Sequence, residues 1–478
     1  MSAVAPHSSA PVVTRPSLWQ LLALAAPVIV SRSSQVVISV TDAAMVAELG
    51  EQALAATTTG GMNTFNILVL PMGIVFIVQT FAAQLMGRGD IAASRRFAWY
   101  GLGIALFTEF ICLLAWPHIH RGVGLFGFDD EVKRLMTSYL QIRLLTGGAA
   151  IGLEALGAWY GGLGNTRLPM ITQIIAMVLN VILNFLLVSG RYGFPALGVE
   201  GSALSSALAT LTAFIVLFVC FLRRVGMPKT TQPTGRLSIR EFGRLLRFGV
   251  PSGFNWFIEF MAFSFFINAV LPVLGTTAVA AMMSVMELNQ VAFMPAFGVA
   301  SAGAIFVGQA IGAGRHDDVP RTVRLAFGVA VGWEALMAVF YFIAPRSFLA
   351  PFVADDATPA AAEHFLVVGA SMLILACAWQ LVDAASMVFS EALRAAGDTT
   401  FTFVARFVIA WAVFVPGVYL SLRVYGGDEK AAVLWLAGYL GLLALVLGLR
   451  FRSNRWRTIQ VTEEVLIAPS PDGEEVVA

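Results

Sequence analysis

Residues 199–222 read VEGSALSSALATLTAFIVLFVCFL, and no charged side chain follows Glu200 in this stretch. An apolar segment of about 20 residues spans the hydrocarbon core of a bilayer as an α-helix, because a helix satisfies its backbone N–H and C=O groups internally. Strands of a membrane barrel would alternate apolar and polar residues, whereas the apolar residues here are continuous. The stretch therefore predicts a transmembrane helix.

Comparable apolar stretches lie on both sides of residues 199–222. Across the 478-residue chain, 58% of residues are apolar and only 12% are charged, against about 25% charged in soluble proteins. We therefore predict an all-α integral membrane protein with about twelve transmembrane helices. The expected spans are residues 19–44, 53–85, 97–117, 135–160, 168–190, 199–222, 245–271, 277–310, 322–344, 363–393, 400–422 and 431–450.

The two halves of the chain repeat one another. The matching pairs are Pro27 with Pro251, Pro71 with Pro295, Gln84 with Gln309, Gly87 with Gly312, and Gly164-Asn165-Thr166 with Gly397-Asp398-Thr399. Each half has an even number of spans, so both halves start on the same side of the membrane. We expect two lobes of about six helices each, related by a pseudo-two-fold axis along the membrane normal, as in transporters.

This repeat also predicts how the chain is divided. The arginine-rich segment between the halves joins them on the cytoplasmic side, and the acidic C-terminal segment looks disordered. The expected parts are an N-terminal cytoplasmic segment (1–18), an N-lobe (19–222), a cytoplasmic linker (223–244), a C-lobe (245–450) and a cytoplasmic tail (451–478).

Basic residues set the expected orientation. Short cytoplasmic loops keep an excess of Lys and Arg, and here Arg88, Arg95 and Arg96 follow the second span while a run of basic residues fills 223–247. Both termini should therefore be cytoplasmic, in a multi-pass protein of the inner (plasma) membrane. The stretch before Trp19 lacks the apolar core of a signal peptide. With a net charge of +1, no nucleic-acid partner is expected, and we expect a monomer in the lipid bilayer.

Carboxyl groups occur inside several predicted spans. A charged carboxylate at the bilayer centre costs about 2.5–3.5 kcal/mol on insertion scales, so each one needs a partner or a function. Asp42 lies in the first span, and Gln35, two helical turns earlier, shares its face. Glu259, Glu287 and Asp383 lie in the second half. Because three such groups cannot all be ionised and unpaired, bound H⁺ or Na⁺ must neutralise them, as in cation-coupled transport.

Other polar residues inside the spans have structural interpretations. Glu109 and Glu334 occupy equivalent repeat positions, which indicates a polar contact kept in both halves. Glu154 shares a helical face with Arg143, eleven residues earlier, and an intramembrane ion pair is expected there.

Amides and prolines complete the polar pattern. Asn180 and Asn184, one turn apart, serve either helix-to-helix hydrogen bonding or a cavity. Pro27 and Pro251 are expected to bend their helices, since each removes a backbone hydrogen bond.

The sequence lacks the marks of several other chemistries. No G-x-x-x-x-G-K-[ST] loop occurs, so ATP hydrolysis by this chain is not supported and energy should come from an ion gradient. Cys112, Cys220 and Cys377 lie singly within apolar runs. No nucleophile–base pair or metal-type spacing is present, so we expect neither an enzyme nor a cofactor other than the coupling ion.

The motifs, taken in order, resemble the multidrug and toxic compound extrusion (MATE) family. The matching stretches run from about Leu21 to Arg450. They are Pro27…Gln35…Thr41-Asp42-Ala-Ala-Met-Val-Ala-Glu-Leu-Gly50, Gly162-Leu-Gly-Asn-Thr-Arg-Leu-Pro169, Asn180-Val-Ile-Leu-Asn184, Gly193-Phe-Pro-Ala-Leu-Gly-Val-Glu-Gly201, Gly249-Val-Pro251, Gly308-Gln-Ala-Ile-Gly-Ala-Gly314 and Glu391-Ala-Leu-Arg-Ala-Ala-Gly-Asp398.

The resemblance implies a twelve-helix antiporter that exports organic, often cationic, compounds in exchange for Na⁺ or H⁺ by switching between outward-open and inward-open states. It places Asp42 at the family's acidic residue of the first helix, with Gln35 beside it and Pro27 at the helix bend. Asn180 matches a family asparagine of the fifth helix, and Asn184 stands where some members have Asp.

In the second half, the resemblance places Glu259 and Asp383 at the C-lobe cation site of the NorM-type branch, where Na⁺ binds. Trp379 stands where that branch has a nearby aromatic residue, often Tyr. Glu287 resembles a carboxylate of the eighth helix that is prominent in proton-coupled relatives.

A flippase and a membrane enzyme are the two alternative classes of protein. A lipid or lipid-linked oligosaccharide flippase would share the two-lobe plan, but its central cavity usually carries basic residues for phosphate. Here the basic residues concentrate in loops, with Arg143 and Arg406 the main exceptions. A membrane enzyme would need a catalytic constellation that the sequence lacks.

Overall fold

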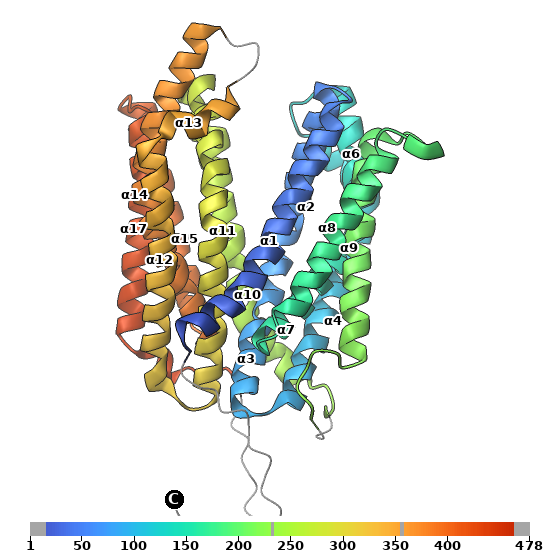
Figure 1. The fold of residues 1–478 in the computed structure, drawn as a ribbon, viewed down its shortest axis with the longest axis vertical. Helices are drawn as coiled ribbons and strands as arrows, with labels where there is room; N and C mark the ends of the chain where they lie inside the picture. The colour runs from blue at the N-terminus through green and yellow to red at the C-terminus, as the bar shows by residue number, and fades with distance from the viewer. Residues whose placement is uncertain (1–15, 231–233, 354–357, 463–478) are drawn as a thin grey trace, which may run out of the picture.

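The computed structural model describes residues 16–230, 234–353 and 358–462. The expected N-terminal segment before Pro16 and the expected disordered tail beyond Thr462 lie outside these residues. The regular secondary structure of the described residues is helical. Figure 1 shows two bundles side by side, one built from the first half of the chain and one from the second.

The helices of the first half form the N-lobe. They are α1 (Leu18–Ala47), α2 (Glu51–Phe76), α3 (Val78–Arg88), α4 (Ile91–Ala115), α5 (Ile119–Val123), α6 (Asp130–Leu144), α7 (Gly147–Gly162), α8 (Arg167–Leu187) and α9 (Gly198–Leu222).

The helices of the second half form the C-lobe. They are α10 (Ile239–Phe265), α11 (Thr276–Gly312), α12 (Val319–Ile343), α13 (Pro345–Leu349), α14 (Pro359–Ala395), α15 (Thr399–Val408), α16 (Val415–Tyr419) and α17 (Glu429–Arg452). π-helical turns extend α10 over Phe266–Val270 and join α15 to α16 over Ile409–Phe414.

Among the described residues, 11 helices are long and apolar enough to cross a membrane. The remaining predicted span, near residues 135–160, is divided into α6 and α7 by a break at Leu145 and Thr146. The two short helices follow one another and take the place of one long helix. The predicted all-α membrane fold with two lobes is therefore confirmed.

Side chains at the helix starts explain several boundaries. Ser17 forms a capping box with Gln20 at the start of α1. Asp90 accepts a hydrogen bond of 2.8 Å from the backbone N–H of Ala93 and begins α4. Such caps satisfy N–H groups that have no partner inside the helix.

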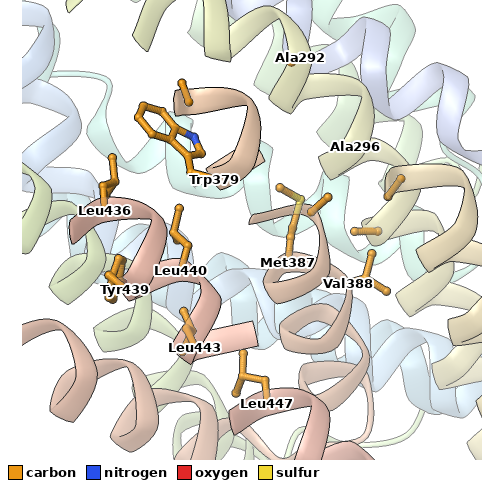
Figure 2. Packing of buried hydrophobic residues seen from close by; sticks show 14 of the residues in the cluster. Ala292, Ala296, Trp379, Met387, Val388, Leu436, Tyr439, Leu440, Leu443 and Leu447 are labelled. Carbon is orange, nitrogen blue, oxygen red and sulfur yellow. The ribbon is translucent and has the colours of Figure 1, made fainter. Parts of the chain in front are cut away.

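Each lobe has its own apolar core. The C-lobe core includes Trp379 of α14 and Leu440 of α17, which Figure 2 shows within one cluster of buried side chains. Leu21 and Ala25 of α1 belong to this same C-lobe cluster. The first turns of α1 thus pack on the opposite lobe, and Figure 1 shows this end of the helix turning toward it.

The two lobes meet through close backbone contacts between α3 and α11. A Cβ atom built on Gly87 would lie 2.1 Å from the carbonyl oxygen of Gln309, and one on Gly312 would lie 1.9 Å from that of Gln84. These four residues form two pairs of repeat equivalents. The contact is therefore self-complementary, as expected for an interface on a two-fold axis.

The lobes are not equally close along their length. They converge toward the end of the molecule that carries the C-terminus of α3 and diverge toward the end that carries α6 and α13 (Figure 1). The Gly87 and Gly312 contacts lie at the converging end.

Candidate functional site

In the N-lobe, Asp42 of α1 accepts hydrogen bonds from three neutral side chains. Ser206 of α9 donates to its Oδ2 at 2.7 Å, and Asn180 of α8 donates to its Oδ1 at 3.1 Å. Asn184 also donates to Oδ1. Asp42 is 6% exposed and both asparagines are fully buried. Three helices thus hold one carboxylate inside the lobe.

The asparagines and the serine are also bonded to each other. Asn180 Nδ2 lies 3.0 Å from Ser206 Oγ, and Asn184 Nδ2 lies 3.2 Å from Asn180 Oδ1. Among the described residues, no basic side chain forms a salt bridge with Asp42, although Arg143 lies within electrostatic range. The carboxylate is surrounded by hydrogen-bond donors, and the nearby Arg143 forms no salt bridge with it in the described part of the chain.

Gln35 is not part of the Asp42 cluster. Its side chain is exposed, and it lines a separate cavity of about 70 Å³ between α1, α7, α8 and α11. That volume holds a few water molecules and is too small for a drug-sized ligand, which needs roughly 300 Å³ or more. Arg32, Glu154 and Ser301 line the same cavity.

The expected ion pair between Glu154 and Arg143 is wrong. Glu154 pairs with Arg32 of α1, whose Nη2 lies 2.7 Å from Oε1 and whose Nη1 lies 3.3 Å from Oε2. The break at Thr146 puts Arg143 and Glu154 on different helices, so the shared face expected from a single helix does not exist.

In the C-lobe, Glu259 of α10 forms a salt bridge with Arg406 of α15. Arg406 also donates from Nε to Oδ1 of Asn255 at 3.0 Å. The Arg406 side chain is 6% exposed and that of Glu259 is 44% exposed. A fixed guanidinium therefore lies against the first of the two carboxylates that the resemblance assigns to a cation site.

Asp383 of α14 lies within electrostatic range of both Glu259 and Arg406. The hydroxyl of Ser386 donates to its backbone oxygen at 3.0 Å and to Oδ1 at 3.4 Å. One helical turn before Asp383, Trp379 is buried and donates from its indole N–H to Oδ1 of Asn289 at 3.3 Å. The two carboxylates and the aromatic residue are thus in one region of the C-lobe.

The repeat-equivalent residues Glu109 and Glu334 have different surroundings. Glu109 accepts a hydrogen bond of 2.5 Å from the backbone N–H of Gly148 at the start of α7, which is a structural contact. Glu334 is 3% exposed and within electrostatic range of Asp383. Its Oε2 has no hydrogen-bond partner among the described residues.

Among the described residues, the remaining predicted site residues form no hydrogen bond or salt bridge with either carboxylate cluster. Glu287 of α11 has an exposed side chain. Pro27 and Pro251 lie inside α1 and α10, which remain helical through them. A proline without its N–H therefore bends or weakens these helices without ending them.

A second buried ionic cluster joins the lobes, and the sequence reasoning did not single it out. Arg394 of α14 pairs with Glu391 and reaches across to α3, where Gln79 accepts at 3.1 Å and Thr80 at 3.3 Å. Its guanidinium also lies 4.2 Å from the centre of the Phe76 ring. Arg32 was missed too, although it is a lone basic residue inside the predicted span 19–44 and the rule for carboxylates would have flagged it.

Comparison with known proteins places the chain in a family. The family model MatE matches residues 27–186 and 251–420, one match in each half. The chain is 28% identical over 463 residues to "Probable multidrug resistance protein NorM" of Rhizobium meliloti, covering 94% of both chains. It is 28% identical over 450 residues to the protein of the same name in Pseudomonas putida, covering 92% of this chain and 95% of that one.

Solved structures agree on the fold. "Outward-facing conformation of a multidrug resistance MATE family transporter of the MOP superfamily" matches with a TM-score of 0.81 and 17% identity, over 94% of this chain and 98% of that one. "Crystal structure of MATE in complex with MaL6" matches with a TM-score of 0.83 and 19% identity, over the same shares. The chain therefore belongs to the MatE family, as a NorM-like transporter rather than an enzyme.

Proposed function

We propose that this chain exports organic, often cationic, drugs or metabolites from the cell in antiport with H⁺ or Na⁺. Its relatives named as multidrug resistance proteins support the substrate class. The proposed orientation has both termini in the cytoplasm, because the basic loops lie at the end where the lobes converge.

The observation that carries the proposal is the environment of Asp42. Three neutral donors hold the carboxylate, and no salt bridge within the described part of the chain neutralises it. A carboxylate in that position stays charged only at a considerable cost. Binding of a proton or Na⁺ to Asp42 removes that cost. Because α1, α8 and α9 together hold the carboxylate, ion binding at Asp42 and the arrangement of these helices depend on each other.

Alternating access follows from how the lobes are joined. The Gly87 and Gly312 contacts and the Arg394 cluster hold the lobes together at the converging end. In the proposed orientation that end faces the cytoplasm, and the arrangement is the outward-open one. Rocking of one lobe against the other would open the opposite side.

A flippase is less well supported by these contacts. Recognition of a lipid phosphate needs basic groups that are free to bind it. Arg32 at the cavity is paired with Glu154, and Arg394 is paired with Glu391. Both of these guanidiniums already have a carboxylate partner, whereas Nε and Nη1 of Arg143 have no hydrogen-bond partner among the described residues.

The test is accumulation of a fluorescent cationic dye, ethidium, in inside-out membrane vesicles with either H⁺ or Na⁺ in excess inside. We expect accumulation that collapses when the gradient is dissipated. Asp42→Asn should abolish it, while Glu48→Gln, an exposed carboxyl at the end of the same helix, should leave it unchanged. The proposal would be refuted if ethidium accumulated without any ion gradient. It would also be refuted if ethidium failed to accumulate under both the H⁺ and the Na⁺ gradient.

A further inference from the structure

We infer that Arg406 is a built-in counter-cation that closes the Glu259–Asp383 pair to Na⁺. This inference deepens the proposed function, because it concerns which ion the antiporter uses. A guanidinium is always charged in proteins and supplies several donors in one plane. It therefore supplies permanently, from within the chain, the positive charge that a bound Na⁺ would bring.

Two side chains one turn apart on α10 hold the Arg406 guanidinium. Asn255 Oδ1 accepts from its Nε at 3.0 Å, and the carboxylate of Glu259 lies against Nη1. Residues i and i+4 share a helical face, so α10 presents one amide and one carboxylate to a group that comes from α15. These contacts hold two of the three guanidinium nitrogens, Nε and Nη1.

The guanidinium is buried although its partner is not. Arg406 is 6% exposed at its side chain, while Glu259 is 44% exposed. An exposed carboxylate facing lipid would be costly, so we place the exposed part of Glu259 in the space between the lobes. An ion entering from that space meets Glu259 with the fixed positive charge directly behind it.

That charge opposes a second cation. A unit charge about 4 Å away, at an effective dielectric constant of about 20, weakens the binding of another cation by about a thousandfold. Asp383 lies within range of the same guanidinium. Both carboxylates of the pair are therefore subject to it.

The other ionisable groups around the pair do not build an alternative site. Glu334 of α12 lies near Asp383, and Tyr439 of α17 lies near Arg406. Glu259 and Asp383 are the two carboxyl groups within electrostatic range of the Arg406 guanidinium. Across the described residues, no group of three or more His, Cys, Asp or Glu side chains is arranged to hold a metal ion.

The test uses Na⁺ itself and does not depend on transport. The thermal unfolding midpoint of the purified full-length protein is measured against NaCl concentration, with choline chloride keeping the ionic strength constant. We expect no saturable Na⁺ effect that depends on Glu259 in the wild type. Arg406→Gln should create one, with an affinity at least a hundredfold above any weak, unsaturated Na⁺ binding of the wild type at the same pair.

Two further variants make the result specific. Arg423→Gln removes an exposed arginine near the end of the same span and should show no Na⁺ effect. Arg406→Gln/Glu259→Gln removes both charges of the pair, so it avoids an unpaired buried charge and should fold without gaining Na⁺ binding. The inference is overturned by saturable Na⁺ binding in the wild type that Glu259→Gln abolishes, or by a folded Arg406→Gln protein that gains no Na⁺ binding. Failure of dye export would instead refute the proposed function and leave these binding results standing.

Discussion

The guanidinium of Arg394 in α14 donates a hydrogen bond of 3.1 Å from Nη2 to Oε1 of Gln79 in α3, across the interface between the lobes. In the reverse direction, the hydroxyl of Thr80 donates to the backbone oxygen of Arg394 at 3.2 Å. Each lobe thus donates a hydrogen bond to the other. The charges of Arg394 and Glu391 are buried at this interface. Removal of one of them should therefore destabilise the protein.

Arg394→Ala should destabilise the protein by about 3 kcal/mol, because it leaves Glu391 buried without its partner. Thermal unfolding in detergent measures the loss. Arg423→Ala, which removes an exposed arginine, is the matched control and should change the midpoint little. Equal effects of the two substitutions would show that the Arg394 cluster does not stabilise the lobe contact.

Gly87→Ala should separate α3 from α11, because the added Cβ would lie 2.1 Å from the backbone oxygen of Gln309. A buried cysteine placed at Ser301 on a background without the native cysteines reports the opening. We expect faster labelling by a membrane-impermeant maleimide added on the side of the converging end, the proposed cytoplasmic side. The control is Gly328→Ala in α12, where a Cβ meets no atom within 4 Å; it should leave the labelling rate unchanged. An unchanged labelling rate in Gly87→Ala would show that the contact between α3 and α11 is not a barrier.

Much of the fold could be predicted from apolar spans and repeats. Residues 199–222 form α9 within one residue of the expected start, because an uncharged run of that length has no other stable form in lipid. The break at Thr146 was missed, although Gly147 and Gly148, which follow it directly, are a helix-breaking pair. The backbone N–H of Gly148, just after the break, donates to Glu109, which lies 39 positions away in sequence.

The candidate sites were partly predictable. A carboxylate inside an apolar span, such as Asp42, draws attention by itself, and the two asparagines on α8 stood out by their spacing. Ser206 did not, because serines are common in membrane helices. The pairing of Glu259 with Arg406 depends on how α10 packs against α15, which the order of residues along the chain does not contain.

Ser206→Ala should weaken the Asp42 cluster through the loss of one hydrogen bond to a charged group, worth about 1.5–3 kcal/mol. The double-mutant cycle with Asp42→Asn isolates that term, since unfolding of all four proteins can be compared. Ser34→Ala on α1, whose hydroxyl bonds only locally to Val30 at 2.8 Å, should show no coupling with Asp42→Asn. A Ser206 coupling energy as small as that of Ser34 would mean that the contact contributes nothing.

Arg32→Met should destabilise the protein by about 3 kcal/mol, because it leaves Glu154 unpaired in the cavity between the helices. Arg32→Met/Glu154→Leu should recover most of that loss, since it removes both charges together. Unfolding midpoints of the two single variants and the double variant test this. A double variant less stable than either single one would indicate that the pair does more than neutralise itself.

We propose that Asp42 binds the coupling ion in alternation with cargo, and one comparison in proteoliposomes tests this role directly. Gradient-driven ethidium accumulation and gradient-free exchange of ethidium for ethidium are measured on the same preparation of wild type and Asp42→Asn. Because an amide cannot change its charge, Asp42→Asn should lose accumulation and keep exchange. Gradient-driven accumulation at the wild-type level in Asp42→Asn would show that Asp42 does not bind the coupling ion.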